Sequence, residues 1–176
     1  MSEGYRAVCK LTLNGTDIEG HNDFTTLGGE DVSDSFQIHE LDWGFESNVS
    51  GAAQLAGQTA FRRLRFVKRI DQATPLISQG LAQGQTTEAV CKLFRTSEAD
   101  GKDRLICTIT VTGGRLTGQF VSHRTSFAQR GSGSEQAITH GTQEEIFIAF
   151  TTIATAYTGD TSTESEISWT TGGYGG

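Results

Sequence analysis

A chain of 176 residues is long enough to form one folded domain with a buried core. Its formal net charge of −7 argues against a nucleic-acid-binding protein, because such proteins present a basic face. Only 35% of the residues are apolar, whereas the chain has 22 glycines and a single proline. This composition favours a β-rich fold with many turns, whose thin apolar supply would be supplemented by surfaces shared with other subunits.

The N-terminal segment, MSEGYRAVCKLTL, has neither the basic region nor the apolar run of a secretory signal peptide. No segment approaches the roughly 20 apolar residues of a transmembrane helix. We therefore expect a protein made in the cytoplasm, without membrane insertion, whose export would use a route that reads no N-terminal signal. Cys9, Cys91 and Cys107 lack the spacing of metal or redox motifs and are expected to be buried or half-buried structural thiols.

Alternation of apolar and polar side chains predicts a series of β-strands. In chain order they are 5–13, 36–47, 60–70, 87–96, 103–112, 116–127, 144–157 and 167–170. Polar or glycine-rich segments predict loops between them at 16–35, 48–59, 97–102 and 128–143. The strand at 144–157 is apolar on both faces, which predicts burial on both sides.

In the strand at 36–47, the alternation places Ile38, Glu40 and Asp42 on one face. The segment 48–59 that follows is small and largely uncharged. It predicts a flexible loop suited to reach a neighbouring chain.

Residues 60–84 combine one strand, a corner and one short helix. Pro75 fits the first helical position and Gly84 supplies the end, so we expect a helix over about 74–83. A helix of this length is too short to be stable alone and must dock on the sheet. The side chains expected to make this contact are Leu76, Ile77 and Leu81.

The strand that leads into this helix carries the only basic cluster of the sequence. Its members are Arg62, Arg63, Arg65, Lys68 and Arg69. One interpretation is a solvated strand face. The other is a contact with an acidic neighbour, including a second copy of this acidic chain.

Motifs that carry chemistry are missing from the sequence. There is no G-x-S-x-G, no phosphate-binding glycine loop and no H-E-x-x-H, and the four histidines are scattered. We therefore predict no metal, no cofactor and no enzymatic activity. Glu40 and Asp42 could form a hydrolase pair because they share a face, but a polar, wet strand face is the favoured interpretation.

The order of these segments resembles the haemolysin-coregulated protein (Hcp) family, the tube subunits of bacterial type VI secretion systems. The residues that carry the resemblance are Trp43-Gly44, Phe66, Lys68, Ile70-Asp71, Thr74-Pro75 and the late strand at 148–157. Each motif is short, and the resemblance depends on their shared order and spacing over roughly residues 5–170.

The resemblance implies a mainly β domain over 1–171, a two-sheet β-barrel or sandwich with one short helix, and a flexible Gly-rich tail at 172–176. It also implies rings of six copies that stack into a tube inside a contractile sheath, with a spike protein at the tip and effectors in the channel. By the same match, Glu40 and Asp42 would line the channel. The protein would leave the cytoplasm through the type VI apparatus.

Ring closure requires a head-to-tail contact between two different surface patches. The candidate subunit-contact residues lie on the basic strand and in the loop before it: Arg63, Arg65, Arg69, Val49 and Leu55. A monomeric β-sandwich that binds a ligand, such as a carbohydrate or adhesion module, is the alternative to a ring.

Overall fold

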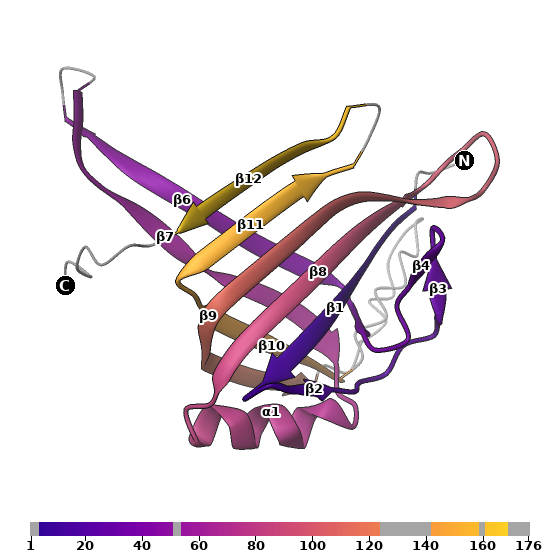
Figure 1. Ribbon diagram of the computed structural model, residues 1–176. Helices are drawn as coiled ribbons and strands as arrows, with labels where there is room; N and C mark the ends of the chain where they lie inside the picture. The colour runs from indigo at the N-terminus through magenta and orange to yellow at the C-terminus, as the bar shows by residue number, and fades with distance from the viewer. Residues whose placement is uncertain (1–3, 51–53, 124–141, 159–160, 169–176) are drawn as a thin grey trace, which may run out of the picture.

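The computed structural model describes residues 4–50, 54–123, 142–158 and 161–168, and the side chains between residues 46 and 60 fall outside the description. The strands are β1 (Tyr5–Leu13), β2 (Thr16–Ile18), β3 (Thr26–Leu27), β4 (Glu30–Asp31), β5 (Phe36–Ile38), β6 (Glu40–Ser50), β7 (Gln54–Arg69), β8 (Thr86–Thr96), β9 (Asp103–His123), β10 (Thr142–Ala149), β11 (Thr152–Tyr157) and β12 (Thr163–Ser168). Helix α1 (Ala73–Ala82) lies between β7 and β8 (Figure 1). The predicted tail at 172–176 lies outside the described residues.

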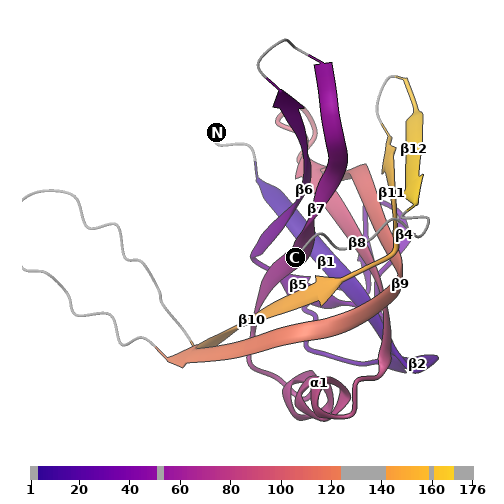
Figure 2. The ribbon, with the colours of Figure 1, turned by 90° about the vertical axis from the view of Figure 1, so that its left-hand side faces the viewer.

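Ten of the described strands form one antiparallel sheet that curls on itself (Figure 2). Around the curl, β1 pairs with β8, β8 with β9, β9 with β10, β10 with β7, and β7 with β6. The circle closes because β5, which pairs with β1, runs almost directly into β6. The predicted mainly β fold with one short helix is confirmed, and β3 and β4 add a small two-stranded sheet.

β9 is one continuous strand that bends at Gly113 and Gly114. One edge of β9 pairs with β8, while the other pairs first with β11 and then with β10. Gly113 has a φ of +61°, and a Cβ at Gly114 would lie 2.7 Å from the carbonyl oxygen of Thr87. Only glycine accepts both conditions without strain, so the predicted interruption between two strands is a bend within one.

The late strand predicted over 144–157 is divided into β10 and β11, which join different parts of the sheet. At the division, the amide of Thr151 donates a hydrogen bond to the carbonyl oxygen of Thr112 at 3.2 Å. The expected burial on both faces is correct only in part. Ile146 and Ile153 are buried, whereas Phe147 on the opposite face is half-buried.

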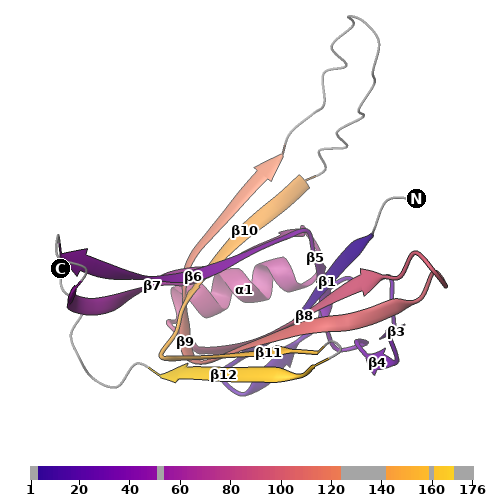
Figure 3. The same cartoon turned by 90° about the horizontal axis from the view of Figure 1, so that it is seen from above.

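Residues 48–59 do not form the predicted flexible loop. β6 and β7 continue through most of this segment as an antiparallel hairpin, in which Val49 is the backbone partner of Leu55. Seen from above, the hairpin and the β11–β12 pair form two separate layers (Figure 3). The prediction was wrong because it relied on side chains, whereas backbone pairing between adjacent strands needs neither charge nor bulk.

A bend at His39 separates β5 from β6 and reverses the phase of the side chains. The His39 amide donates to the carbonyl oxygen of Val67 at 2.7 Å. Ile38 faces the core, while Glu40 and Asp42 are exposed. The predicted shared face of these three residues is therefore wrong, because simple alternation does not continue across a bend.

Helix α1 begins one residue earlier and ends one residue earlier than predicted, so Pro75 is its third residue. Ile77 is fully buried and Leu81 packs partly against the core, as expected. Leu76 is 45% exposed, so its predicted contact with the core is wrong. On a helix, adjacent residues point about 100° apart, and a helix that rests on one sheet buries only one side.

Two glycines at the C-terminal end of α1 allow it to fit closely against the sheet. A Cβ on Gly80 would lie 2.7 Å from Cδ1 of Leu13, so the helix approaches the sheet closely there. Gly84 has a φ of +60° and follows the helix end, as predicted. Within the described part of the chain, no helix has the length and hydropathy needed to cross a membrane.

Two apolar clusters fill the molecule. The larger one lies inside the barrel and includes Phe36, Leu64, Phe66 and Ile77. The smaller one lies outside it, where Leu27 and Val32 pack against Val8 and Phe94. The segment that carries β3 and β4 therefore covers the outer side of β1 and β8.

Candidate functional site

β7 presents cations on both of its faces. Lys68 points inward, in phase with Leu64 and Phe66, and its side chain is fully buried. Arg65 points outward, and its side chain is 26% exposed. Because successive side chains of a strand point to opposite faces, the basic cluster of the sequence is divided between the core and the surface.

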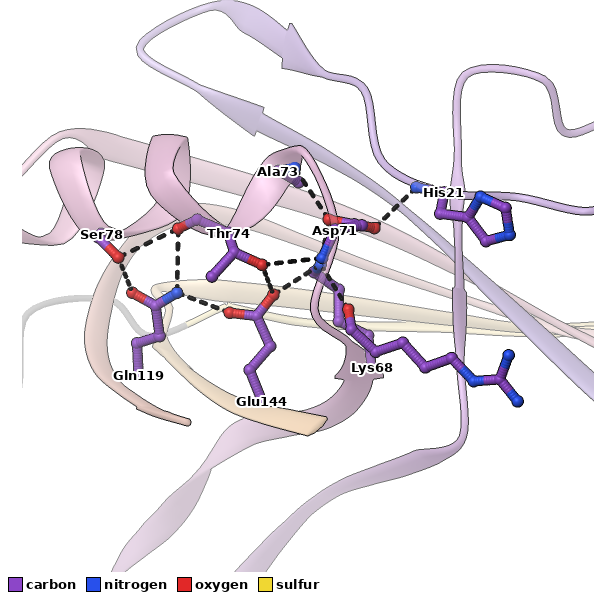
Figure 4. Close-up of polar contacts among 9 residues, drawn as sticks. His21, Lys68, Asp71, Ala73, Thr74, Ser78, Gln119 and Glu144 are labelled. Atoms are coloured by element: carbon purple, nitrogen blue, oxygen red, sulfur yellow. Dashed lines mark hydrogen bonds and ion pairs between the residues drawn. The ribbon is translucent and has the colours of Figure 1, made fainter. Parts of the chain in front are cut away.

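Lys68 sits between two carboxylates at the junction of β7 and α1 (Figure 4). Its Nζ lies 2.5 Å from Oδ1 of Asp71 and 2.6 Å from Oε1 of Glu144. It also donates to the carbonyl oxygen of Arg69 at 3.0 Å and lies 5.2 Å from the centre of the Phe36 ring. The side chains of Lys68 and Glu144 are completely buried, so their charges must be compensated by each other.

Glu144 receives further hydrogen bonds from α1 and β9 (Figure 4). The Thr74 hydroxyl donates to its Oε1 at 2.6 Å, and the Gln119 side-chain amide donates to its Oε2 at 2.6 Å. The Ser78 hydroxyl donates to Oε1 of Gln119 at 2.7 Å. No buried side-chain polar atom of the described residues lacks a partner, so this network is satisfied.

Asp71 links the same junction to the loop before β3. Its Oδ2 accepts the amide of His21 at 2.7 Å, and its Oδ1 accepts the amide of Ala73, the first helical residue, at 2.8 Å. Burial raises the pKa of the Asp71 carboxyl, but the hydrogen bonds from Lys68 and from these amides outweigh burial and hold the pKa below its ordinary value. The N-cap residue Gln72 makes no side-chain cap hydrogen bond, and it is Asp71 that accepts the first amide of the helix.

We use the name Lys68 cluster for the linked side chains of Lys68, Asp71, Thr74, Gln119 and Glu144. The cluster joins β7, α1, β9 and β10 and keeps its charges away from solvent, so its role is structural. The sequence analysis placed Lys68 in the basic cluster of this strand and did not pair it with Glu144. The pattern that indicates this pair is the alternation of β7, which places Lys68 on the same face as Phe66. A lysine on that buried face requires a buried carboxylate as its partner.

A second group of charges lies on the outside of the sheet. We use the name Arg65 face for the outward side of β6, β7, β10 and the second half of β9. Its described side chains include Glu40, Asp42, Arg63, Arg65, Phe120, Glu145 and Phe147.

Arg65 forms ion pairs with three carboxylates from two neighbouring strands. Its guanidinium lies 2.9 Å from Oε2 of Glu40 and 2.5 Å from Oδ2 of Asp42, both on β6, and it also binds Glu145 on β10. The hydrogen bond to Glu145 is the strongest of the influences that raise the pKa of Arg65. The charge of Arg65 is therefore already compensated within the chain.

This arrangement bears directly on the predicted roles. The sequence analysis assigned Glu40 and Asp42 to a channel surface and Arg65 to a subunit contact. The structure brings all three onto one face, so they belong to a single surface. Glu40 and Asp42 are also 57% and 66% exposed and bind the same cation, which does not provide the enclosed site that an acid–base pair requires.

Arg63 has a different environment from Arg65. Its guanidinium carbon lies 4.7 Å from the centre of the Phe147 ring, and it donates to the Thr117 hydroxyl at 3.5 Å. Arg69 is exposed near the end of β7. Among the described residues, no carboxylate forms an ion pair with either arginine. The predicted contacts of the Val49 and Leu55 side chains lie outside the described residues.

The three cysteines lie where structural thiols are expected. Cys9 on β1 and Cys91 on β8 are cross-strand partners and buried, while Cys107 is half-buried. Burial raises the pKa of the Cys9 thiol well above its usual value, and Cys91 raises it further. Across the described ranges, no group of three His, Cys, Asp or Glu side chains could hold a metal ion.

Comparison with known proteins agrees with the fold. The sequence matches the family model described as "Type VI secretion system effector, Hcp" over residues 11–157. No curated protein sequence matches the chain.

Several solved structures have the same fold at low sequence identity. A mutant form of Hcp1 from the E. coli EAEC 042 pathovar has a TM-score of 0.74 at 16% identity, covering 93% of this chain and 98% of that one. Hcp1 from Salmonella typhimurium has a TM-score of 0.64 at 16% identity, covering 94% and 96%. The secreted protein Hcp3 from Pseudomonas aeruginosa has a TM-score of 0.64 at 15% identity, covering 96% and 100%.

The matched segment extends from β1 to the last residue of β11 and includes the Lys68 cluster and the Arg65 face. The chain belongs to the Hcp family, the tube and secreted proteins of type VI secretion systems, and it is a structural protein without enzymatic activity.

Proposed function

We propose that this chain forms homohexameric rings that stack into the inner tube of a type VI secretion system. In this proposal the tube lies inside a contractile sheath, carries a spike protein at its tip and holds effectors in its channel. The chain is made in the cytoplasm and leaves it through the apparatus itself. The observation that carries the proposal is the family match, which spans nearly the whole barrel.

The surface of the single chain supports a shared assembly. Large apolar side chains lie exposed on several elements, among them Phe120 at 62%, Val121 at 56% and Tyr157 at 49%. A contiguous exposed apolar patch marks an interaction surface, and the Phe120 ring extends such a patch by packing against Phe147. A tube subunit needs such surfaces for its neighbours within the ring and for the next ring.

We propose that the β6 end of the Arg65 face, with Glu40 and Asp42, lines the channel. Both carboxylates are exposed, and Arg65 holds them in place while it offsets part of the negative charge that they share with Glu145. A hydrated wall of charged side chains suits a channel through which different proteins must pass, because it offers no single tight binding site.

Electron microscopy of negatively stained protein, together with native mass spectrometry, tests the proposal. Rings with a central hole and a mass of six chains are the expected result. A monomer at micromolar concentration would contradict the proposal and would support the alternative of a monomeric binding module.

A further inference from the structure

Two surfaces of this chain, one at each end of β9, differ in shape and charge. The first is a projecting aromatic group at the C-terminal end of β9, on the Arg65 face. Phe120 is 62% exposed, and its ring lies 5.9 Å from that of Phe147 in an edge-to-face arrangement. Arg63 lies over the other ring at 4.7 Å. We call these three residues the Phe120 knob.

Gly118 allows Phe120 to hold this position. A Cβ at Gly118 would lie 3.1 Å from Phe120 and 3.3 Å from Phe147, so a side chain there would require both rings to shift, whereas glycine lets them pack directly over the strand. The knob is therefore braced by its own strand. A braced, exposed aromatic ring beside an arginine is the composition typical of a binding hot spot.

The second surface is a shallow hollow on the outer side of β9, β11 and β12. Its floor consists of small side chains, and its outer rim carries two carboxylates. The floor residues are Thr108, Thr110, Ala154 and Ala156, and the rim residues are Glu164 and Glu166. We call this surface the β12 hollow.

The register of β9, β11 and β12 aligns the lining residues of the β12 hollow in rows across the three strands. Thr108 lies opposite Ala156, which lies opposite Glu164 on the edge strand. Within the described chain, no lysine or arginine forms an ion pair with Glu164 or Glu166, and both are exposed. The rim therefore offers two uncompensated negative charges next to a floor on which an aromatic ring can lie flat.

The distances between side chains in the Phe120 knob match the distances between residue rows in the β12 hollow. In the hollow, two strand spacings of about 4.8 Å separate the threonine row from the glutamate row, which gives roughly 10 Å. In the knob, Phe147 on β10 lies between Phe120 on β9 and Arg63 on β7, and its ring centre is 5.9 Å from that of Phe120 and 4.7 Å from the guanidinium carbon of Arg63. A ring seated on the threonine and alanine floor would therefore bring Arg63 to the glutamate rim.

The knob and the hollow lie on opposite sides of the bend at Gly113 and Gly114. A strand rises roughly 3.3 Å per residue, so roughly 30 Å of the curved path of β9 separates Thr110 from Phe120. The two patches are also different, so a contact between them is head-to-tail and repeats from copy to copy. This is the type of contact that closes a ring.

We propose that the Phe120 knob of one copy binds in the β12 hollow of the next copy and forms the contact between neighbours in the ring. The occupant of the hollow is thus a second copy of this chain. The inference rests on the proposed ring function and names the residues that make its interface. Phe120 supplies the buried anchor, and Arg63 pairs with Glu164 and Glu166.

Substitutions in the knob test the contact. Phe120→Ser is expected to weaken ring formation by about 30-fold or more in protein concentration, as hot-spot residues do. Leu76→Ser is the matched control, because Leu76 is also exposed, at 45%, but lies on α1 outside both surfaces. The readout is the fraction of six-chain mass in native mass spectrometry across a dilution series, with near-ultraviolet circular dichroism showing that each chain is folded.

A charge exchange tests the pairing itself. Arg63→Glu alone, and Glu164→Arg with Glu166→Arg, are each expected to disperse the rings, whereas the combination of all three restores them. Restoration is not expected from a merely structural role of Arg63. A combination that stays dispersed, although each chain is folded, would overturn the pairing.

A disulfide trap tests the geometry between copies. Ser122 is exposed two residues from Phe120 on the same face of β9, so Ser122→Cys protein mixed with Ala156→Cys protein should form an oxidised dimer of two chains, while either variant alone should form far less. Both proteins carry Cys107→Ser, because Cys107 is half-buried whereas Cys9 and Cys91 are buried.

The outcomes separate the two proposals. If the unmodified chain forms rings and Phe120→Ser leaves them intact, the knob is not the ring contact, although the ring function stands. If Phe120→Ser spares the rings but abolishes their stacking into tubes, the knob binds the next ring and the inference is overturned. If the unmodified chain is monomeric, the ring function fails and the inference fails with it.

Discussion

Lys68 and Arg65 stand three residues apart on the same strand, and each binds carboxylates, yet their surroundings differ completely. The side chain of Lys68 is fully buried with Glu144, whereas Arg65 is 26% exposed and its β6 partners are more than half exposed. Water screens the second set of charges and is excluded from the first. The comparison shows that one short basic segment can hold both a structural core element and a solvated surface network.

The largest expected effect comes from removing the buried cation. Lys68→Met leaves Glu144 and Asp71 close together without a counter-charge, and a broken buried ion pair costs about 3–5 kcal/mol of the free energy of unfolding. Urea denaturation followed by circular dichroism measures it. Lys92→Met is the matched control, since the Lys92–Glu30 pair is 25% and 43% exposed and should cost at most about 1 kcal/mol. An equal loss in both variants would contradict the contrast between buried and exposed pairs.

The same contrast applies to the apolar side chains of α1. Ile77→Ala should lower the free energy of unfolding by about 2–5 kcal/mol, because Ile77 is fully buried and its loss leaves a cavity. Leu76→Ala should cost less than about 1 kcal/mol, because Leu76 is 45% exposed. Urea unfolding midpoints of the two single variants measure the two losses of stability. Similar losses would show that Leu76 is also packed in the folded chain.

The surface cation should matter less and should respond to salt. Arg65→Met is expected to cost about 1 kcal/mol at low ionic strength, because three partly exposed carboxylates lose their common partner. The difference from the unmodified chain should shrink in 1 M sodium chloride, where charges are screened within about 3 Å. Lys68→Met should keep most of its effect in the same salt, and a strong salt dependence of that variant would contradict its burial.

The contribution of Asp71 should appear in the pH dependence of the free energy of unfolding, as an effect smaller than those above. Because the pKa of its carboxyl in the folded chain lies below the ordinary value of 3.8, Asp71 stabilises the fold fully above that value. This stabilisation is lost as the pH falls through the lowered pKa of the folded chain. We expect unfolding free energies measured from pH 6 downward to decline more steeply for the unmodified chain than for Asp71→Asn. Parallel curves would show that Asp71 is not the titrating group.

Much of the strand and helix order could be predicted from local patterns. The alternation in β1 and β8, the turn at Asn14-Gly15 and the glycine after α1 are local features, and local physical rules decide them. The hairpin at 48–59 and the division of the late strand could not be predicted in the same way. They depend on which other strand offers backbone partners, and that information lies far away in the sequence.

The candidate surfaces show the same limit. The sequence named Glu40, Asp42, Arg63 and Arg65 as surface residues, but it could not show that Arg65 holds both carboxylates. The bend at His39 turns Glu40 outward, and only the pairing of β6 with β7 then brings it to Arg65.

By itself, the sequence determined the mainly β character, the position of the single helix and the family. Composition, the spacing of apolar residues and the order of motifs can be read along the chain without knowing which residues are in contact. Only the tertiary structure decided that Lys68 lies in the core with Glu144 and that Phe120 projects from the end of β9. The reason is physical. Whether a charge or a ring is buried depends on the strands and helices that pack over it, and these are brought together from distant parts of the chain.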